Sequence, residues 1–123
     1  LIKTINRQNF GITFEPANLM ACGSNFNKNA LNELLPHTEN FYFQNILLDK
    51  KGNHVFPTIH NGDVKVKYVS LDNAKGINVF SFLDFLKEKK YDKWFTIHQP
   101  LLEGQTVEIA IESASKLFLQ YKF

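Results

Sequence analysis

The sequence predicts a mainly β fold of the α+β class, with about seven strands in an open or pseudo β-barrel and two short helices. Three observations support this prediction. Apolar residues alternate with polar ones over several short stretches, which is the period of a half-buried strand. Aromatic residues make up 14% of the chain, twelve of them Phe, and favour a β-rich core. The 123 residues, 44% of them hydrophobic, suffice for a single domain over residues 1–123.

The first third of the chain indicates short strands, a loop and a helix. Residues 1–14 alternate loosely and indicate one or two strands with a polar break between them. Residues 15–29 are rich in Asn and small residues, which is typical of a loop. Asn27 or Asn29 then caps a helix of about two turns, and Pro36 ends it.

The centre of the chain, residues 41–68, indicates a β-meander. Residues 41–48 form a strand with apolar side chains on both faces, and Asn61-Gly62 is a strong signal for a two-residue hairpin turn. That turn places His60 opposite Asp63. One face of the ribbon then carries Val55, Pro57, Ile59, Val64, Val66 and Tyr68. The other face carries Phe56, Thr58, His60, Asp63, Lys65 and Lys67, and is either a solvated surface or a surface that faces a ligand.

The last third predicts a helix, a strand and a terminal hairpin. A capping-box pattern at Ser81 begins the helix, which ends near Lys90, and residues 94–97 form a short strand. Alternation returns from Thr106, with a loop at 113–115 between two strands. This hairpin pairs Ile111 with Leu117, Ile109 with Leu119, Val107 with Tyr121, and Glu112 with Lys116.

Composition narrows the functional classes only slightly. The net charge of +2 neither requires nor excludes a polyanionic partner, and Arg7 is the only arginine. Cys22 is the only cysteine, so we expect a reducing, cytoplasmic location. We expect no membrane span. A chain that begins at Leu1 without Met is compatible with a domain excised from a longer protein, with a linked catalytic domain.

Catalytic signals are weak throughout. We find no phosphate-binding loop, dinucleotide fingerprint, paired Cys or His-x-x-x-His spacing. His54 and His60 lie six residues apart, about 20 Å in a strand, which is too far to share a metal. Cys22 is more typical of a structural thiol than of a nucleophile. We therefore predict no catalytic residue, metal or cofactor within this chain, and leave open whether the protein is an enzyme.

Polar residues without an evident structural role gather in three places, at residues 7–9, in the loop 23–28 and at the ribbon tip 58–67. Asn can read adenine, Lys can contact guanine or phosphate, and a two-stranded ribbon fits a major groove. These residues make DNA binding a hypothesis, although Asn-rich loops also form simple turns.

The order of elements resembles the B-three-type DNA-binding pseudobarrel of plant transcription factors and of target-recognition domains in certain type II restriction endonucleases. Leu34-Leu-Pro36 closing a short helix, Asp49-Lys-Lys-Gly52 between strands and Leu102-Glu-Gly-Gln-Thr-Val-Glu-Ile109 carry the resemblance. It implies sequence-specific recognition of double-stranded DNA by two arms in the major groove, as in a restriction or related defence protein. The family's late Gly-Asp is Gly104-Gln105 here, and its arms are richer in Arg.

By this resemblance the first arm would contain Arg7, Ser24, Asn25, Asn27 and Lys28. The second arm would contain Thr58, His60, Asn61, Lys65 and Lys67. The alternative hypothesis is a small protein-interaction module, such as an inhibitor or immunity-type protein, that does not bind nucleic acid. It would use Tyr42, Phe56 or Phe118 as hydrophobic anchors. A small-ligand-binding barrel or an enzyme is a further possibility.

Overall fold

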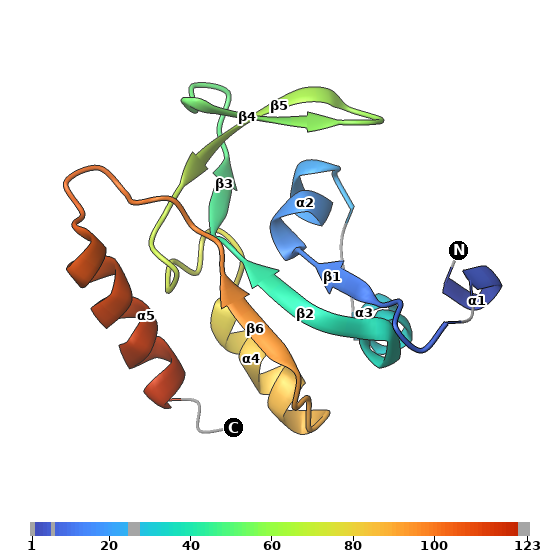
Figure 1. Ribbon diagram of the computed structural model, residues 1–123. Coiled ribbons are helices and arrows are strands. Elements are labelled where there is room, and N and C mark those ends of the chain that lie inside the picture. Colours follow the sequence, from blue (N-terminus) through green and yellow to red (C-terminus); the bar gives the residue numbers. More distant parts are fainter. Residues whose placement is uncertain (1, 6, 25–27, 121–123) are drawn as a thin grey trace.

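The computed structural model describes residues 2–5, 7–24 and 28–120, and it contains two three-stranded sheets (Figure 1). The first sheet is parallel in the order β1-β2-β6, with β1 (Ile12–Phe14), β2 (Thr38–Phe43) and β6 (Trp94–Ile97). The second is antiparallel in the order β3-β5-β4, with β3 (Ile46–Leu48), β4 (His54–Thr58) and β5 (Gly62–Tyr68). The predicted barrel of about seven strands is therefore wrong.

The described residues also form five α-helices and one 3-10 helix. They are α1 (Ile2–Ile5), α2 (Pro16–Ala21), α3 (Lys28–Leu34), the 3-10 helix η1 (Leu35–His37), α4 (Val79–Glu88) and α5 (Val107–Gln120). Neighbouring parallel strands require a crossover. Here α2 and α3 lie between β1 and β2 in the sequence, and α4 lies between β3–β5 and β6. None of the described helices combines the length and the apolar character needed to cross a bilayer.

The core lies around the central strand β2. Phe41 and Phe43 of β2 are almost completely buried, and each belongs to a separate cluster of apolar side chains. Leu83 and Leu117 bring α4 and α5 into the Phe43 cluster. Phe95 of β6 packs against both clusters, so β6 joins the two halves of the core.

Helix α5 replaces the predicted terminal hairpin. Ala110, Ala114 and Leu117 follow helical spacing and are its less exposed residues, whereas Ile109 and Ile111, which suggested a strand, are exposed. Alanine adds little to a hydrophobic pattern but strongly favours helices. The pattern of large apolar residues alone therefore did not indicate this helix. The predicted Glu112–Lys116 pair does form, at 2.7 Å, but one helical turn apart. Tyr121 lies outside the described residues.

The predicted ribbon exists as β4 and β5, but with a different register. Thr58 pairs with Gly62 and Phe56 with Val64, which leaves a three-residue turn over 59–61. The Thr58 hydroxyl accepts a hydrogen bond from Asn61 N and donates one to Gly62 O, which favours this longer turn. The observed register differs from the predicted one by an odd number of residues. Side chains of β4 that were expected on one face of the hairpin therefore lie on the other face. Phe56 therefore lies on the core side, and Val55 is 49% exposed.

Other predictions were confirmed or corrected at the level of single elements. The strand at 94–97 is confirmed, and α3 ends just before the 3-10 turn that contains Pro36. The predicted strand 41–48 is divided between the two sheets, and the predicted loop 15–29 contains α2, with Pro16 in its first turn. Helix α4 begins earlier than expected, because the side chain of Asn78 caps it by accepting from Ser81 N.

Candidate functional site

The three parallel strands end at the same edge of their sheet, and a polar residue follows each of them. Glu15 follows β1, Gln44 follows β2 and His98 follows β6. Ligands of parallel sheets with helical crossovers bind beyond the carboxyl ends of the strands. The antiparallel sheet lies beyond the same ends of β2 and β6 in Figure 1, so it borders this region.

Glu15 is the centre of this polar group. Its carboxylate accepts hydrogen bonds from Gln44 Nε2 and, at 2.8 Å, from Asn18 Nδ2. His98 Nδ1 lies 3.7 Å from Glu15 Oε1. The Glu15 side chain is 15% exposed, whereas that of His98 is 61% exposed. The carboxylate is thus oriented by two amides, and an accessible imidazole lies beside it.

Aromatic rings surround the carboxylate and the imidazole. The ring centroid of Tyr42 lies 5.2 Å from that of His98, and the ring centroid of Tyr68 lies 4.6 Å from that of His54. Burial raises the pKa of the Tyr68 hydroxyl, and the negative charge of Glu15 raises it further. Tyr68 is therefore a neutral hydrogen-bond donor at physiological pH.

A cavity of about 490 Å³ lies beside these groups, although Glu15 and Tyr42 do not line it. Its walls are Gln44, His54, Tyr68, Ile97, His98, Gln99 and Pro100. This volume is within the range of small-molecule sites. Amides, imidazoles and a phenol all form hydrogen bonds, which suits a ligand with several hydroxyl groups. Among the described residues, no three His, Cys, Asp or Glu side chains gather in a way that could hold a metal ion.

The described residues of the predicted first arm do not line this cavity. Arg7, Ser24 and Lys28 are exposed, and none of them lines it. Asn25 and Asn27 fall outside the described residues.

The predicted second arm lies on the β4–β5 hairpin. Its members His60, Asn61, Lys65 and Lys67 are exposed, whereas the Thr58 hydroxyl is engaged in the turn. The loop that precedes the first arm approaches the hairpin tip, because a Cβ atom built on Gly23 would lie 3.1 Å from Asn61 Nδ2.

The hydrophobic anchors of the protein-interaction hypothesis are only half-exposed. Tyr42, Phe56 and Phe118 all have intermediate exposure. The more exposed large apolar residues include Trp94 and Ile111, at 77% and 61%.

Sequence reasoning missed Glu15, Gln44 and His98. Each directly follows a short apolar strand, since Ile-Thr-Phe, Phe-Tyr-Phe and Phe-Thr-Ile end immediately before them. The sequence therefore contained a signal for the site, namely a polar residue directly after each of three short apolar strands. It identifies a site only if the three strands are known to be parallel neighbours, since antiparallel pairing would place successive strand ends at opposite edges.

No protein-family model matches the chain, and no curated protein sequence matches it. One solved structure that resembles it is the xylose isomerase domain protein from Planctomyces limnophilus, which has a TIM-barrel fold. The TM-score is 0.62 and the sequence identity 22%, over 97% of this chain and 39% of that one. The chain thus spans about two fifths of the length of the solved protein. At this identity the likeness shows the fold alone.

Proposed function

We propose that the carboxyl-end site binds a small polyhydroxylated molecule, such as a pentose sugar. The observation that carries this proposal is the convergence of Glu15, Gln44 and His98 from three parallel strands beside one cavity. Amides and a carboxylate hydrogen-bond to hydroxyl groups, and aromatic rings offer apolar faces for the C–H side of a sugar. The name of the Planctomyces limnophilus protein points to the same substrate class.

The chemistry that this site supports is proton transfer. Glu15 and His98 lie 3.7 Å apart and His98 lines the cavity, so the imidazole can take a proton from a ligand at one nitrogen while its Nδ1 proton passes to the Glu15 carboxylate, and the reverse transfer returns it. Proton transfer next to a carbonyl is the reaction class by which aldose and ketose sugars interconvert.

Titration of the ¹⁵N-labelled protein with D-xylose tests the proposal. We expect amide shifts at Gln44, His98 and Gln99. Glu15→Gln should weaken binding about tenfold, because a hydrogen bond to a charged group contributes about 1.5–3 kcal/mol. The matched control is Glu33→Gln, which changes an exposed carboxylate on α3. Shifts that are absent at millimolar sugar, in a protein whose spectrum is folded, would contradict the proposal.

Recognition of duplex DNA is a second candidate. It is favoured by the closeness of the Gly23 turn to Asn61, and by Lys65 and Lys67, which are exposed together on β5. Its test is selection from a randomised duplex pool at two salt concentrations, with the double substitution Lys65→Ala and Lys67→Ala. Enrichment of a motif that salt and the substitutions both weaken is the expected result. Absence of retention at low salt would exclude this candidate.

A cytoplasmic location is part of the proposal. It rests on the single cysteine, Cys22, which is free and partly buried.

A further inference from the structure

Among the described residues, no lysine or arginine lines the cavity beside Glu15. Proteins bind phosphate groups through lysine and arginine side chains, or through backbone N–H groups at the start of a helix. The helix next to the site offers few such groups, because α2 begins with Pro16, which has no N–H, and Asn18 N already donates to Glu15 O at 3.2 Å. A phosphate in this cavity would therefore lose its water without gaining these partners.

The negative charge of Glu15 acts on this cavity, although the residue does not line it. Its carboxylate accepts hydrogen bonds from two neutral amides, Gln44 and Asn18. In the described part of the chain, His98 is the one ionisable side chain within ion-pair distance of it. The Glu15 side chain is largely buried, so water screens its charge only in part. Tyr68 lines the cavity, and the Glu15 charge is, after burial, the second cause of the raised pKa of its hydroxyl.

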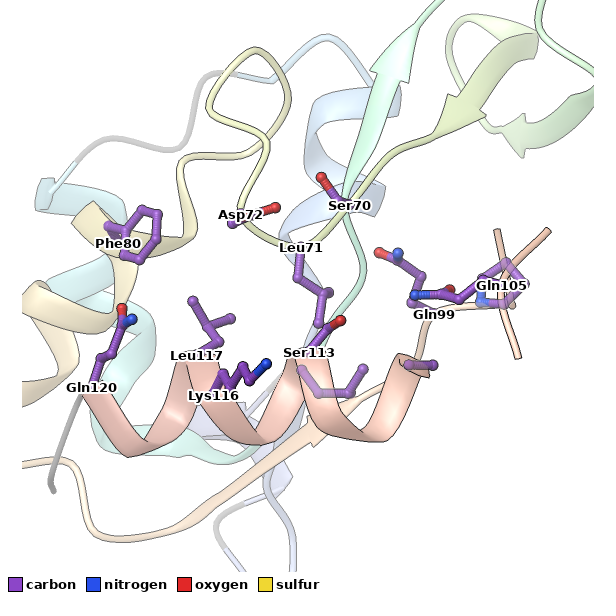
Figure 2. Close-up of a pocket in the computed structure, with 13 residues that line it drawn as sticks. Ser70, Leu71, Asp72, Phe80, Gln99, Gln105, Ser113, Lys116, Leu117 and Gln120 are labelled. Carbon is purple, nitrogen blue, oxygen red and sulfur yellow. The ribbon is translucent and has the colours of Figure 1, made fainter. Parts of the chain in front are cut away.

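A lysine does line the neighbouring cavity, of about 570 Å³, between the loop that follows β5 and α5 (Figure 2). Lys116 Nζ lies 2.7 Å from Glu112 Oε1 there, so its charge already has a partner. Gln99 lines both cavities, and its side chain is fixed between them. Its Oε1 accepts from Asn45 N at 2.8 Å, and its Nε2 donates to Val69 O at 2.9 Å. Lys116 therefore does not supply a cation to the cavity beside Glu15.

We propose that the carboxyl-end site binds an unphosphorylated sugar, and that Glu15 excludes sugars that carry an anionic group. This inference rests on the proposed function and deepens it, because it narrows the substrate class from sugars in general to uncharged sugars. Glu15 then acts on specificity in two ways. Its carboxylate orients Gln44, whose amide lines the cavity, and its charge repels a phosphate.

The experiment compares the binding of D-xylose and D-xylose 5-phosphate to the full chain by NMR, at about pH 8, where free imidazole is uncharged. The wild type should bind xylose at least about tenfold more tightly than its phosphate, because like charges repel in a partly buried site. Glu15→Gln keeps the size of the side chain and removes its charge, so the ratio of the two affinities should fall towards one. Glu33→Gln is the matched control, since it makes the same change of charge at an exposed position on α3 and should leave the ratio unchanged.

Salt provides a second measurement that needs no substitution. Added NaCl screens the repulsion, so it should strengthen the binding of xylose 5-phosphate to the wild type and leave the binding of xylose unchanged. This arm decides between charge and shape even if Glu15→Gln does not fold, which its NMR spectrum would show.

Each outcome decides a different point. Equal binding of xylose and its phosphate to the wild type overturns the inference on charge and leaves the proposed function intact. Failure of both to bind overturns the proposed function as well. Rejection of the phosphate that neither Glu15→Gln nor salt relieves is an effect of shape, and it also overturns the inference. Relief of the rejection by salt and by Glu15→Gln, but not by Glu33→Gln, supports it.

Discussion

Asn45 shows how much one buried side chain organises near the site. It is completely buried, and its Nδ2 atom donates to the carbonyl oxygens of Ser70, Leu71 and Asn73. Its Oδ1 atom accepts from Ile77 N at 2.7 Å. One amide thus satisfies four backbone groups of the loop between β5 and α4.

We expect Asn45→Ala to lower the free energy of unfolding by about 3 kcal/mol, because buried backbone groups lose their partner. Urea denaturation measures the change. Asn53→Ala, at an exposed position in a bend, is the control and should change stability by less than about 0.5 kcal/mol. Equal effects of the two substitutions would show that the amide does not hold the loop.

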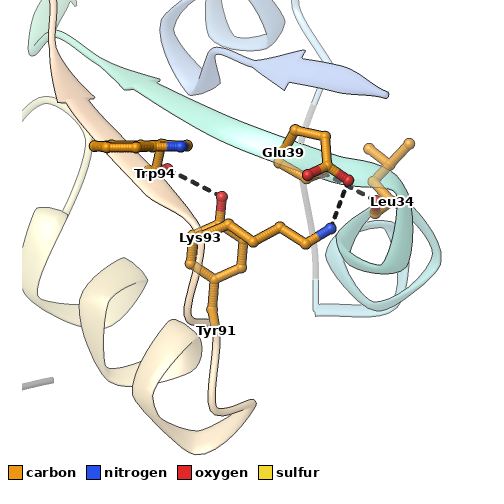
Figure 3. A network of polar contacts seen from close by, with 6 residues as sticks. Leu34, Glu39, Tyr91, Lys93 and Trp94 are labelled. Carbon is orange, nitrogen blue, oxygen red and sulfur yellow. Dashed lines mark hydrogen bonds and ion pairs between the residues drawn. The ribbon is translucent and has the colours of Figure 1, made fainter. Parts of the chain in front are cut away.

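Tyr91 is the second residue whose effect can be measured, through the stability of the protein at high pH (Figure 3). Its hydroxyl donates to Trp94 O at 2.9 Å. Burial raises its pKa to about 12, and the negative charges of Glu39 and Asp92 contribute. The unfolded chain, with a tyrosine pKa near 10, therefore loses this proton first as the pH rises.

The free energy of unfolding should consequently fall between pH 10 and about pH 12, since the folded state binds more protons there. After allowance for solvent screening of a partly exposed group, we expect a fall of about 1 kcal/mol from Tyr91. Tyr91→Phe should flatten this part of the profile in urea titrations at several pH values. A variant whose alkaline fall equals that of the wild type would contradict the assignment. The difference in stability between Tyr91→Phe and the wild type at neutral pH measures the lost hydrogen bond alone, because Tyr91 does not titrate there.

At the scale of elements, the sequence correctly predicted those features that depend only on neighbouring residues. The strand at 94–97 and the helix end at Pro36 depend on neighbouring residues, and both were found from sequence. The register of β4 and β5 depends on turn length, and the Thr58 hydroxyl selected a turn that the Asn61-Gly62 pattern did not predict. Alternation in α5 suggested strands, because the alanines on its less exposed face carry little hydrophobic signal.

The observed register of the hairpin predicts unequal effects of two neighbouring substitutions. Phe56→Ala should lower the free energy of unfolding by about 2 kcal/mol, since Phe56 packs against the core cluster. Val55→Ala should change it by less than about 0.5 kcal/mol, because Val55 is 49% exposed. Chemical denaturation of both variants measures this. A larger loss of stability in Val55→Ala than in Phe56→Ala would contradict the observed register and favour the predicted two-residue turn.

Proline at Ser115 distinguishes the helix from the predicted hairpin. In the interior of α5, Ser115→Pro should cost about 3 kcal/mol and reduce the helical circular dichroism. In a hairpin loop the same residue would be tolerated. Ser115→Ala is the control and should leave the helix signal unchanged or slightly stronger.

At the scale of the whole molecule, the candidate site follows from topology. Glu15, Gln44 and His98 are distant in sequence, and each alone resembles an ordinary polar residue at a strand end. They meet because β1, β2 and β6 are parallel neighbours, which no local pattern reveals. The sequence therefore contained the residues of the site without indicating that they lie together.

Phe95 links the two core clusters, as does Phe82, whose ring lies close to those of Phe41 and Phe43. The ring of Phe95 lies 5.0 Å from that of Phe118 and 6.4 Å from that of Phe41, centroid to centroid, and these rings belong to different clusters. We expect urea transitions of the wild type by far-UV and near-UV circular dichroism to coincide. Phe95→Ala should lower stability by about 3 kcal/mol without separating the two transitions, because Phe82 still links the clusters. Separate transitions in the wild type would contradict the coupling.

The late position of β6 in the chain has a consequence for protein synthesis. The hairpin of β4 and β5 pairs neighbours in sequence and can form as soon as it leaves the ribosome. The central strand β2 leaves earlier, yet one of its edges has no partner until residues 94–97 emerge. During that interval Phe41 and Phe43 lack much of their packing, and the nascent chain is a natural client for chaperones that bind exposed aromatic segments.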